Sequence, residues 1–310
     1  MDRKGVASIG ECMLELSARP DGAWDLGYAG DTFNTLWAIR ALTGLPCDYV
    51  SAFGDDPFSA KQIAFLAEAG IGIAASPVIP GARPGLYAIT LTGAERSFTY
   101  WRSDSAAKQL ASKPAQLANS LENRALVYFS GITLAILSPA ARETLLAAVA
   151  DARKAGSLIA FDPNYRPRLW ASPGEAKAAI DAALAVCNIV LPTFPDEQML
   201  CGDASPAATA ERLLAAGVRE IVVKDGAEPC LVVTDGNRST VPAVHVANPV
   251  DTTGAGDSFN GGYLSARLLG HPPAEAAAMA HRVAAAVVQV RGALAPYETL
   301  RSAFAIDGKA

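Results

Sequence analysis

A carboxylate stands among glycines in the segment VDTTGAGDSFNGG, residues 250–262. Gly254, Ala255 and Gly256 directly precede Asp257, at a point where a helix is expected to begin. The first turn of a helix leaves backbone N–H groups unpaired and carries the positive end of the helix dipole, so it suits an anion such as phosphate. A carboxylate at this place would repel phosphate, so its presence suggests that it acts on a second group beside the phosphate.

The segment therefore predicts phosphoryl transfer to a hydroxyl group. The backbone amides of residues 254–257 would hold the charge of the transferring group. Asp257 would act as a general base on the attacking hydroxyl, an effect that contributes about 10²–10⁴-fold. The alternative is a glycine-rich helix start in which Asp257 is an ordinary N-terminal carboxylate. No GxxxxGK[ST] sequence occurs, and Phe259 stands where GxGxxG needs its third glycine, which disfavours a nicotinamide-dependent dehydrogenase.

From about residue 125 onward, strand-like and helix-like segments alternate. The strand patterns are ALVYFSG, SLIAFDPN, NIVLPTF and EIVVKDG, and the helix patterns are SPAARETLLAAVADARKAG, SPGEAKAAIDAALAVC and SPAATAERLLAAGV. Ser138 is placed to cap the first of these helices and Gly156 to end it. Apolar strands between amphipathic helices predict a mainly parallel sheet that is covered on both faces. PCLVVTDG and RSTVPAVHV have no helix between them and predict a hairpin at the sheet edge.

The N-terminal part is less regular. GVASIGECMLELS begins as a core strand, and DTFNTLWAIRALTG predicts a helix that starts at Asp31. Two segments rich in alternating strand patterns, about 12–30 and 83–103, are separated in the sequence and could pair. We expect residues 1–310 to form one α/β domain, with a small β-sheet lid made from these two segments.

Composition limits the class of partner. The chain has 310 residues, 51% of them hydrophobic, and a formal net charge of −5, which argues against nucleic acid or an anionic membrane as a partner. No apolar stretch approaches the ~18 residues of a membrane span, and the opening residues lack the pattern of a signal peptide. Five scattered cysteines suit reduced thiols. We therefore expect a cytoplasmic protein with small-molecule ligands.

The segment DTTGAGDSFNGG resembles the second signature of the ribokinase (phosphofructokinase-B) family of sugar kinases. GECMLELS, AGDTFNTLWAIRALTG and VVKDGAEPC follow the order of that family over nearly the whole chain. One departure is Ala29, where many members have the first glycine of Gly-Gly-Asp. The resemblance implies a ribokinase-like three-layer α/β sandwich, with Asp257 as the catalytic base and the turn 254–257 as the anion hole. It also implies ATP and Mg²⁺, leaves a monovalent cation open, and suggests a homo-oligomer paired through the lid sheet.

The same resemblance assigns ligand contacts. Gly30, Asp31 and Asn34 would bind hydroxyl groups of the sugar, although Asp31 also suits a helix N-cap. Lys224 and Gly226 would lie beneath the nucleotide, where the alternative is a simple polar turn.

Three further residues have less specific signals. The resemblance places Asn164 and Glu197 near the magnesium ion and the phosphates, where Mg²⁺ needs few protein ligands. It places His281 close to the adenine, and a surface or core-edge position is the alternative.

SFTYWRSDSAAKQL and FDPNYRPRLW resemble the members of the family that act on 2-keto-3-deoxygluconate, and Tyr87, Tyr100, Arg102 and Arg166 match them. Two arginines suit a sugar acid, because a carboxylate accepts a bidentate guanidinium. Arg102 could instead be a solvated charge at a strand end, and Arg166 could contact ATP. The alternative functions are a fructokinase, a kinase for a related ketoacid, or a non-catalytic sugar sensor, which would have no need of Asp257.

Overall fold

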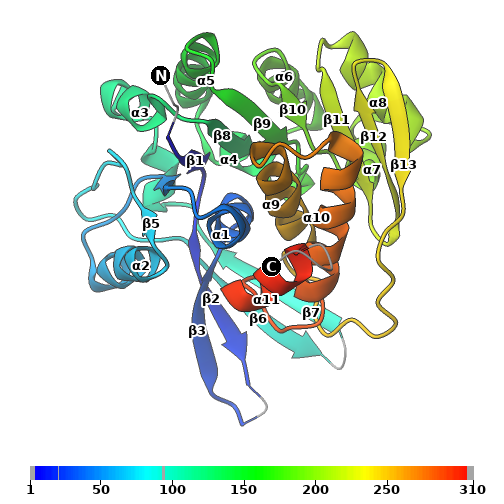
Figure 1. Cartoon of the computed structure of the whole chain (residues 1–310). Coiled ribbons are helices and arrows are strands. Elements are labelled where there is room, and N and C mark those ends of the chain that lie inside the picture. The colour runs from blue at the N-terminus through cyan, green and yellow to red at the C-terminus, as the bar shows by residue number, and fades with distance from the viewer. Residues whose placement is uncertain (1–3, 20, 93–94, 306–310) are drawn as a thin grey trace.

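The computed structural model describes residues 4–19, 21–92 and 95–305. They are arranged around a nine-stranded sheet in the order β13-β12-β11-β10-β9-β8-β1-β4-β5 (Figure 1). These strands are β1 (Val6–Ile9), β4 (Cys47–Val50), β5 (Ile71–Gly72), β8 (Leu126–Ser130), β9 (Leu158–Asp162), β10 (Ile189–Val190), β11 (Glu220–Asp225), β12 (Glu228–Thr234) and β13 (Asn237–Val241). The strands from β11 to β5 in this order pair in parallel, and β12 and β13 add an antiparallel hairpin at one edge. The predicted parallel sheet and its edge hairpin are confirmed.

A second sheet of four strands has the order β3-β2-β6-β7. Its strands are β2 (Met13–Ala18), β3 (Trp24–Ala29), β6 (Leu86–Thr92) and β7 (Glu95–Trp101). The two β-rich segments of the sequence pair here through β2 and β6, which run in parallel, while each forms a hairpin of its own. Figure 1 shows this small sheet below the large one, reached directly from β1.

Helices cover both faces of the large sheet, because successive apolar side chains along its strands point to opposite faces. On one face lie α1 (Asp31–Thr43), α9 (Ala255–Leu268), α10 (Pro273–Val287) and α11 (Tyr297–Phe304), and on the other α3 (Pro114–Leu121), α5 (Pro139–Lys154), α6 (Pro173–Leu184) and α8 (Pro206–Ala215) (Figure 1). Shorter or peripheral helices are α2 (Pro57–Glu68), α4 (Gly131–Ile136) and α7 (Phe194–Cys201). Val6 and Tyr128 contribute to the first core and Ala7 and Val127 to the second, so adjacent residues of one strand serve opposite layers.

Local sequence explains where several helices begin. The Ser138 side chain accepts a hydrogen bond from the backbone N–H of Ala141 and Pro139 occupies the first helical position, as the capping pattern predicted. The N-cap interpretation of Asp31 is wrong: Gly30 is the N-cap of α1, and no side chain caps this helix. Asp31 is the first helical residue, so its carboxylate is available for contacts elsewhere.

Helices α1 and α9 approach closely, and this contact positions the site described below. A Cβ atom at Gly261 of α9 would lie 2.5 Å from Cβ of Ala38 and 2.8 Å from the carbonyl oxygen of Thr35, both in α1. Only glycine allows this approach, which brings the first turns of the two helices side by side. Within the described residues, no helix is long and apolar enough to cross a membrane.

Candidate active site

A cavity of about 710 Å³ lies between the large sheet and the small sheet. This volume is typical of a site for a small ligand. Its lining includes nine of the residues that the sequence singled out, namely Gly30, Asp31, Asn34, Tyr87, Tyr100, Arg102, Asn164, Arg166 and Asp257. Every residue predicted to contact the sugar is therefore brought to one cavity, although their positions span more than two hundred residues of sequence.

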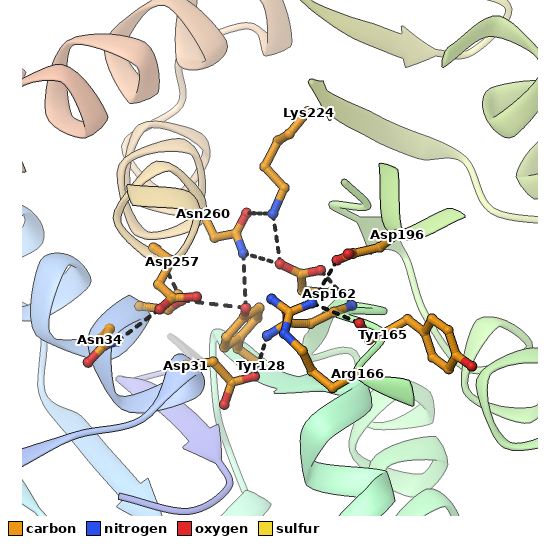
Figure 2. Close-up of polar contacts among 12 residues, drawn as sticks. Asp31, Asn34, Tyr128, Asp162, Tyr165, Arg166, Asp196, Lys224, Asp257 and Asn260 are labelled. Carbon is orange, nitrogen blue, oxygen red and sulfur yellow. Dashed lines mark hydrogen bonds and ion pairs between the residues drawn. The ribbon is translucent and has the colours of Figure 1, made fainter. Parts of the chain in front are cut away.

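Asp257 lies in the first turn of α9 and faces the cavity (Figure 2). Its Oδ2 accepts a 2.8 Å hydrogen bond from Nδ2 of Asn34, and its backbone oxygen accepts one of 3.0 Å from Oγ1 of Thr35. Desolvation and the nearby carboxylate of Asp31 raise the pKa of Asp257 to about 7, against the opposing hydrogen bond from Asn34. A base with a pKa near the working pH is well suited to accept a proton.

The turn before Asp257 has two glycines with different requirements. Gly254 is the N-cap of α9 with φ 74°, a left-handed conformation that other residues rarely adopt, and a Cβ there would lie 3.0 Å from atoms of Ala293. Gly256 is helical, and a Cβ there would meet only Nζ of Lys224, at 3.9 Å. Gly254 is therefore required by the backbone, whereas Gly256 leaves open space beside an ammonium group.

Polar side chains from separate elements fix the part of the cavity near Asp257. The backbone N–H of Gly30 donates to Oδ1 of Asn34 at 3.3 Å, which orients the Asn34 amide with its nitrogen toward Asp257. Nδ2 of Asn164 donates to Oδ2 of Asp31 at 2.8 Å. Asn164 has φ 36°, and its backbone N–H donates to Oδ1 of Asp162 at 3.0 Å. A non-glycine residue held in this strained region is a feature often found at functional sites.

The cavity lining also contains two arginines and several aromatic side chains. Arg102 follows β7 and donates from Nη2 to the carboxylate of Glu11, while Nη1 of Arg166 donates to Oδ2 of Asp196 at 3.0 Å. Tyr87 and Tyr100 lie with ring centroids 5.6 Å apart. Neither arginine is a free charge, since each is paired with a protein carboxylate.

Tyr87 and Tyr100 differ in what they can offer a ligand. The hydroxyl of Tyr87 donates to a carboxylate oxygen of Glu15, and burial together with that carboxylate raises the pKa of Tyr87. Tyr100 is half exposed, and its ring also packs against Phe98, which lines the cavity. Tyr87 therefore has a fixed orientation, whereas Tyr100 stands at the open side.

A buried polar network of Lys224, Asp162, Asn260 and Tyr128 adjoins the site (Figure 2). Nζ of Lys224 donates to Oδ2 of Asp162 at 2.7 Å and to Oδ1 of Asn260 at 2.9 Å. Nδ2 of Asn260 donates to the same oxygen of Asp162 at 2.7 Å and to the hydroxyl of Tyr128 at 3.1 Å. Because Asn260 is one turn after Asp257 on α9, the network ties the orientation of that helix to strands β8, β9 and β11.

Several residues assigned to the nucleotide, the transferring phosphoryl group or the metal lie outside the cavity lining. They are Lys224, Gly226, Glu197, His281 and the turn residues Gly254, Ala255 and Gly256. Gly226 lies in the turn between β11 and β12 with φ 59°. His281 is buried in α10, edge-on to Phe259 with centroids 4.9 Å apart, and desolvation lowers its pKa.

Glu197 in α7 takes part in a separate ion-pair cluster. Its Oε2 accepts from Nη2 of Arg212 at 2.5 Å, and Arg212 also contacts Asp203 at 2.7 Å. Burial raises the pKa of Glu197 to about 7, against the influence of Arg212. Its neighbour Asp196 is the acidic residue of this segment that contacts a cavity residue.

The donor chemistry of the site fits Mg²⁺ carried by a nucleotide. Among the described residues, no group of three or more His, Cys, Asp and Glu side chains is arranged to hold a metal ion. Mg²⁺ prefers oxygen ligands, keeps several waters and is commonly held through substrate phosphates with few protein ligands. Asn164 donates its amide nitrogen to Asp31, which leaves the side-chain oxygen as a donor suited to the ion or its waters.

The sequence did not identify several residues that lie at or beside the site. Glu11 lines the cavity, and Asp162, Asn260 and Asp196 each contact a residue of the site. Local signals existed for two of them: Asp162 precedes Asn164 at the end of a predicted strand, and Asn260 is three residues after Asp257. The only local signal for Glu11 was its position just after the first predicted strand.

Comparisons with known proteins identify the family of this chain. The model of the pfkB family of carbohydrate kinases matches residues 3–300. A Dickeya dadantii protein named 2-dehydro-3-deoxygluconokinase is 41% identical over 311 aligned positions, covering 97% of this chain and 99% of that protein. The Escherichia coli K12 protein of the same name is 40% identical over 306 positions, covering 96% and 99%. A solved E. coli protein described as a Ribokinase II, in complex with ATP and Mg²⁺, has a TM-score of 0.85 at 26% identity and covers 97% of this chain and 98% of that chain. This chain belongs to the pfkB family of carbohydrate kinases.

Proposed function

We propose that this protein transfers the γ-phosphoryl group of ATP to the C6 hydroxyl of 2-keto-3-deoxygluconate (2-dehydro-3-deoxygluconate). The product is 2-keto-3-deoxy-6-phosphogluconate. The observation that carries the proposal is that one cavity is lined both by the carboxylate of Asp257 and by two arginines. The names of relatives that are 41% and 40% identical over nearly the full length support the same substrate.

Asp257 acts as the general base in this reaction. With a pKa of about 7 it is substantially ionised at neutral pH and accepts the proton of the C6 hydroxyl as that oxygen attacks phosphorus. Asn34 holds the carboxylate in place by its hydrogen bond to Oδ2. A non-catalytic sugar sensor would not need such a base, so the arrangement favours an enzyme.

The nucleotide side of the site is built from the turn 254–257 and its surroundings. The N-terminal amides of α9 receive the transferring phosphoryl group, and the ammonium of Lys224 lies beside Gly256, where it adds positive charge. Gly226 lies under the nucleotide and His281 near the adenine. Bound Mg²⁺ would neutralise phosphate charge. Asn164 would hold the ion or its waters, and Glu197 would have a more remote, indirect role.

Arg102 and Arg166 hold the carboxylate end of the sugar acid. A guanidinium has five N–H donors, so the bonds to Glu11 and Asp196 leave donors for the ligand. The aromatic side chains Tyr87 and Tyr100 cover the ligand, and Gly30 and Asp31 contact its hydroxyls. The same ion pairs favour the alternative of a neutral sugar, as in a fructokinase, because they already balance both arginine charges.

A coupled assay of ADP release separates these functions. The purified enzyme is compared on 2-keto-3-deoxygluconate, 2-keto-3-deoxygalactonate, fructose and ribose, with the product identified by mass spectrometry. A charge-assisted hydrogen bond is worth roughly 1.5–3 kcal/mol, or about ten- to a hundredfold. We expect kcat/KM for a 2-keto-3-deoxy acid to exceed that for fructose by at least this factor. Equal or better kcat/KM on fructose would move the protein to the fructokinase alternative, and no turnover on any sugar would favour a sensor.

Three further assignments accompany this proposal. The small sheet exposes Trp24, Leu26 and Trp101, which supports a homo-oligomer. All five cysteines are free thiols, which supports a cytoplasmic location. A monovalent-cation requirement is tested by comparing activity in potassium, sodium and tetramethylammonium salts.

A further inference from the structure

We propose that Glu11 is the positioning residue of Arg102, and that it sets both the orientation and the net charge of the carboxylate-binding end of the cavity. This inference rests on the proposed function of Arg102 as a contact of the sugar acid. Glu11 is separated from the end of β1 by Gly10 alone, and its side chain lines the cavity beside Arg102. Nη2 of Arg102 donates to Oε2 of Glu11.

Burial makes this ion pair unusual. The Glu11 side chain is 1% exposed and that of Arg102 is 13% exposed, so water solvates neither charge well. Within the described part of the chain, Oε1 of Glu11 and Nε of Arg102 have no hydrogen-bond partner. The Glu11 carboxylate therefore depends on Arg102 for its stabilisation, because an isolated buried carboxylate is strongly disfavoured.

A close approach at Gly85 makes room for the pair. A Cβ atom at Gly85 would lie 2.5 Å from Oε1 of Glu11, 3.1 Å from Cγ of Met13 and 3.2 Å from Cβ of Arg102. Any side chain at this position would push the carboxylate away from its present place. The backbone before β6 is thus fitted to the Glu11–Arg102 pair.

The pair has two consequences for a sugar acid. The charge-assisted bond fixes one edge of the guanidinium and so directs the remaining N–H donors, which lets a carboxylate bind without first ordering the side chain. It also means that loss of Arg102 leaves Glu11 as an uncompensated negative charge beside the acid. Part of the effect of removing Arg102 is therefore repulsion by Glu11.

A double-mutant cycle of Glu11→Gln and Arg102→Ala tests this inference on the full-length enzyme. Glutamine keeps the shape of glutamate and replaces a charge-assisted bond by a neutral one. In the wild-type background we expect Glu11→Gln to raise KM for the sugar acid about five- to tenfold and to leave KM for ATP unchanged. In the Arg102→Ala background the same substitution is expected to lower KM for the acid, because it removes the repelling charge. An equal effect in both backgrounds would show that Glu11 does not act through Arg102 and would overturn the inference.

Gly85→Ala separates geometry from charge. It displaces the Glu11 carboxylate without altering any charge, and it should raise KM for the acid severalfold at an unchanged KM for ATP. An unchanged KM for the acid would overturn the positioning role. Asp48→Asn is the matched control: Asp48 pairs with Arg124, whose side chain is 12% exposed, and neither residue lines the cavity. This control should leave both KM values unchanged.

The outcome is separable from that of the proposed function. The wild-type comparison of the acid with fructose decides the substrate, whereas the cycle decides the coupling between residues 11 and 102. If the wild-type enzyme prefers the acid and the cycle is additive, only the role of Glu11 fails. If the wild-type enzyme prefers fructose, the substrate proposal fails. The inference about Glu11 is still decided by the cycle: it fails if Glu11→Gln changes KM for the acid equally in both backgrounds.

Discussion

Asp257, the proposed general base, is a carboxylate whose surroundings oppose its ionisation. Burial, Asp31 and Asp162 raise its pKa, while the amide of Asn34 and the ammonium of Lys224 lower it. The balance gives a base that is neither too weak to accept a proton nor permanently protonated. Removal of this carboxylate, and its titration, are the direct tests at the scale of a single residue.

Asp257→Asn should abolish most turnover and leave ATP binding nearly intact. Asparagine retains an oxygen that can accept from Asn34 but cannot take a proton, so the loss should be at least about 10²-fold in kcat. Steady-state kinetics together with calorimetric titration of ATP check both parts. Residual activity within about threefold of the wild type would contradict the role of a base.

The pH dependence follows from the raised pKa of Asp257. The base works in its ionised form, so kcat/KM for the sugar should fall as the pH decreases through about 7. The folded-state pKa lies above the ordinary value of 3.8, so the folded state binds more protons between these values and loses stability as the pH rises through them. Asp257→Asn should therefore raise Tm at pH 8 and have a smaller effect at pH 4. An activity profile that remains flat down to pH 5 would argue against this titration.

At the scale of secondary-structure elements, the first turn of α9 is the decisive feature. Its N-cap glycine is required by the backbone, whereas the glycine two residues later leaves open space, and α1 holds the turn in place through the contact at Gly261. The two glycines of one motif thus have separable roles, one in the fold and one at the ligand.

Substitution of each glycine by alanine should separate these roles. Gly254→Ala forces a left-handed φ on alanine and contacts Ala293, so we expect a loss of stability of about 1 kcal/mol or more. Gly256→Ala lies inside a helix, where alanine is favoured by about 1 kcal/mol, so Tm should not fall. It should nevertheless raise KM for ATP or lower kcat, because the added methyl group occupies space beside Lys224. A fully active Gly256→Ala enzyme would show that phosphate does not approach this turn.

The small sheet should close over the sugar. Strand β6 supplies Tyr87 to the cavity and β7 supplies Phe98 and Tyr100. Closing elements of this kind exclude water from the reaction. Amide hydrogen exchange in residues 13–18 and 86–92 should slow when the sugar acid is added. Residues 139–154 of α5, on the far face of the large sheet, serve as the internal control. Unchanged exchange in the strands at saturating ligand would remove the idea of a lid.

At the scale of the whole molecule, the exposed apolar side chains of the small sheet suggest self-association. Trp24 and Leu26 of β3 and Trp101 of β7 are exposed large hydrophobic residues of this sheet. Light scattering coupled to size-exclusion chromatography should therefore report an oligomer. Leu26→Asp should shift the protein toward the monomer, because a charge on that surface would be buried unpaired. A wild-type monomer at micromolar concentration would contradict the prediction.

The sequence predicted the backbone of the site better than its charge pairing. Apolar strands between amphipathic helices identified the parallel sheet, and the long glycine motif located the start of α9 and Asp257. The partners of Arg102, Lys224 and Glu197 were not predictable, because each pair joins segments that meet only in the folded chain and leaves no local pattern. The N-cap interpretation of Asp31 failed for a related reason: its carboxylate is engaged by Asn164, 133 positions away in the sequence.

The bond between Asn34 and Asp257 also constrains when the enzyme can become active during its synthesis. The two residues are 223 positions apart, so the ribosome releases α1 long before the base that it orients. Strand β1 likewise lies between β8 and β4 and must wait for a neighbour made much later. Contacts of such high sequence separation slow folding and leave early segments exposed in the meantime. A chain that ends before α9 lacks the proposed base, so premature termination anywhere in the first four-fifths of the message should yield an inert product.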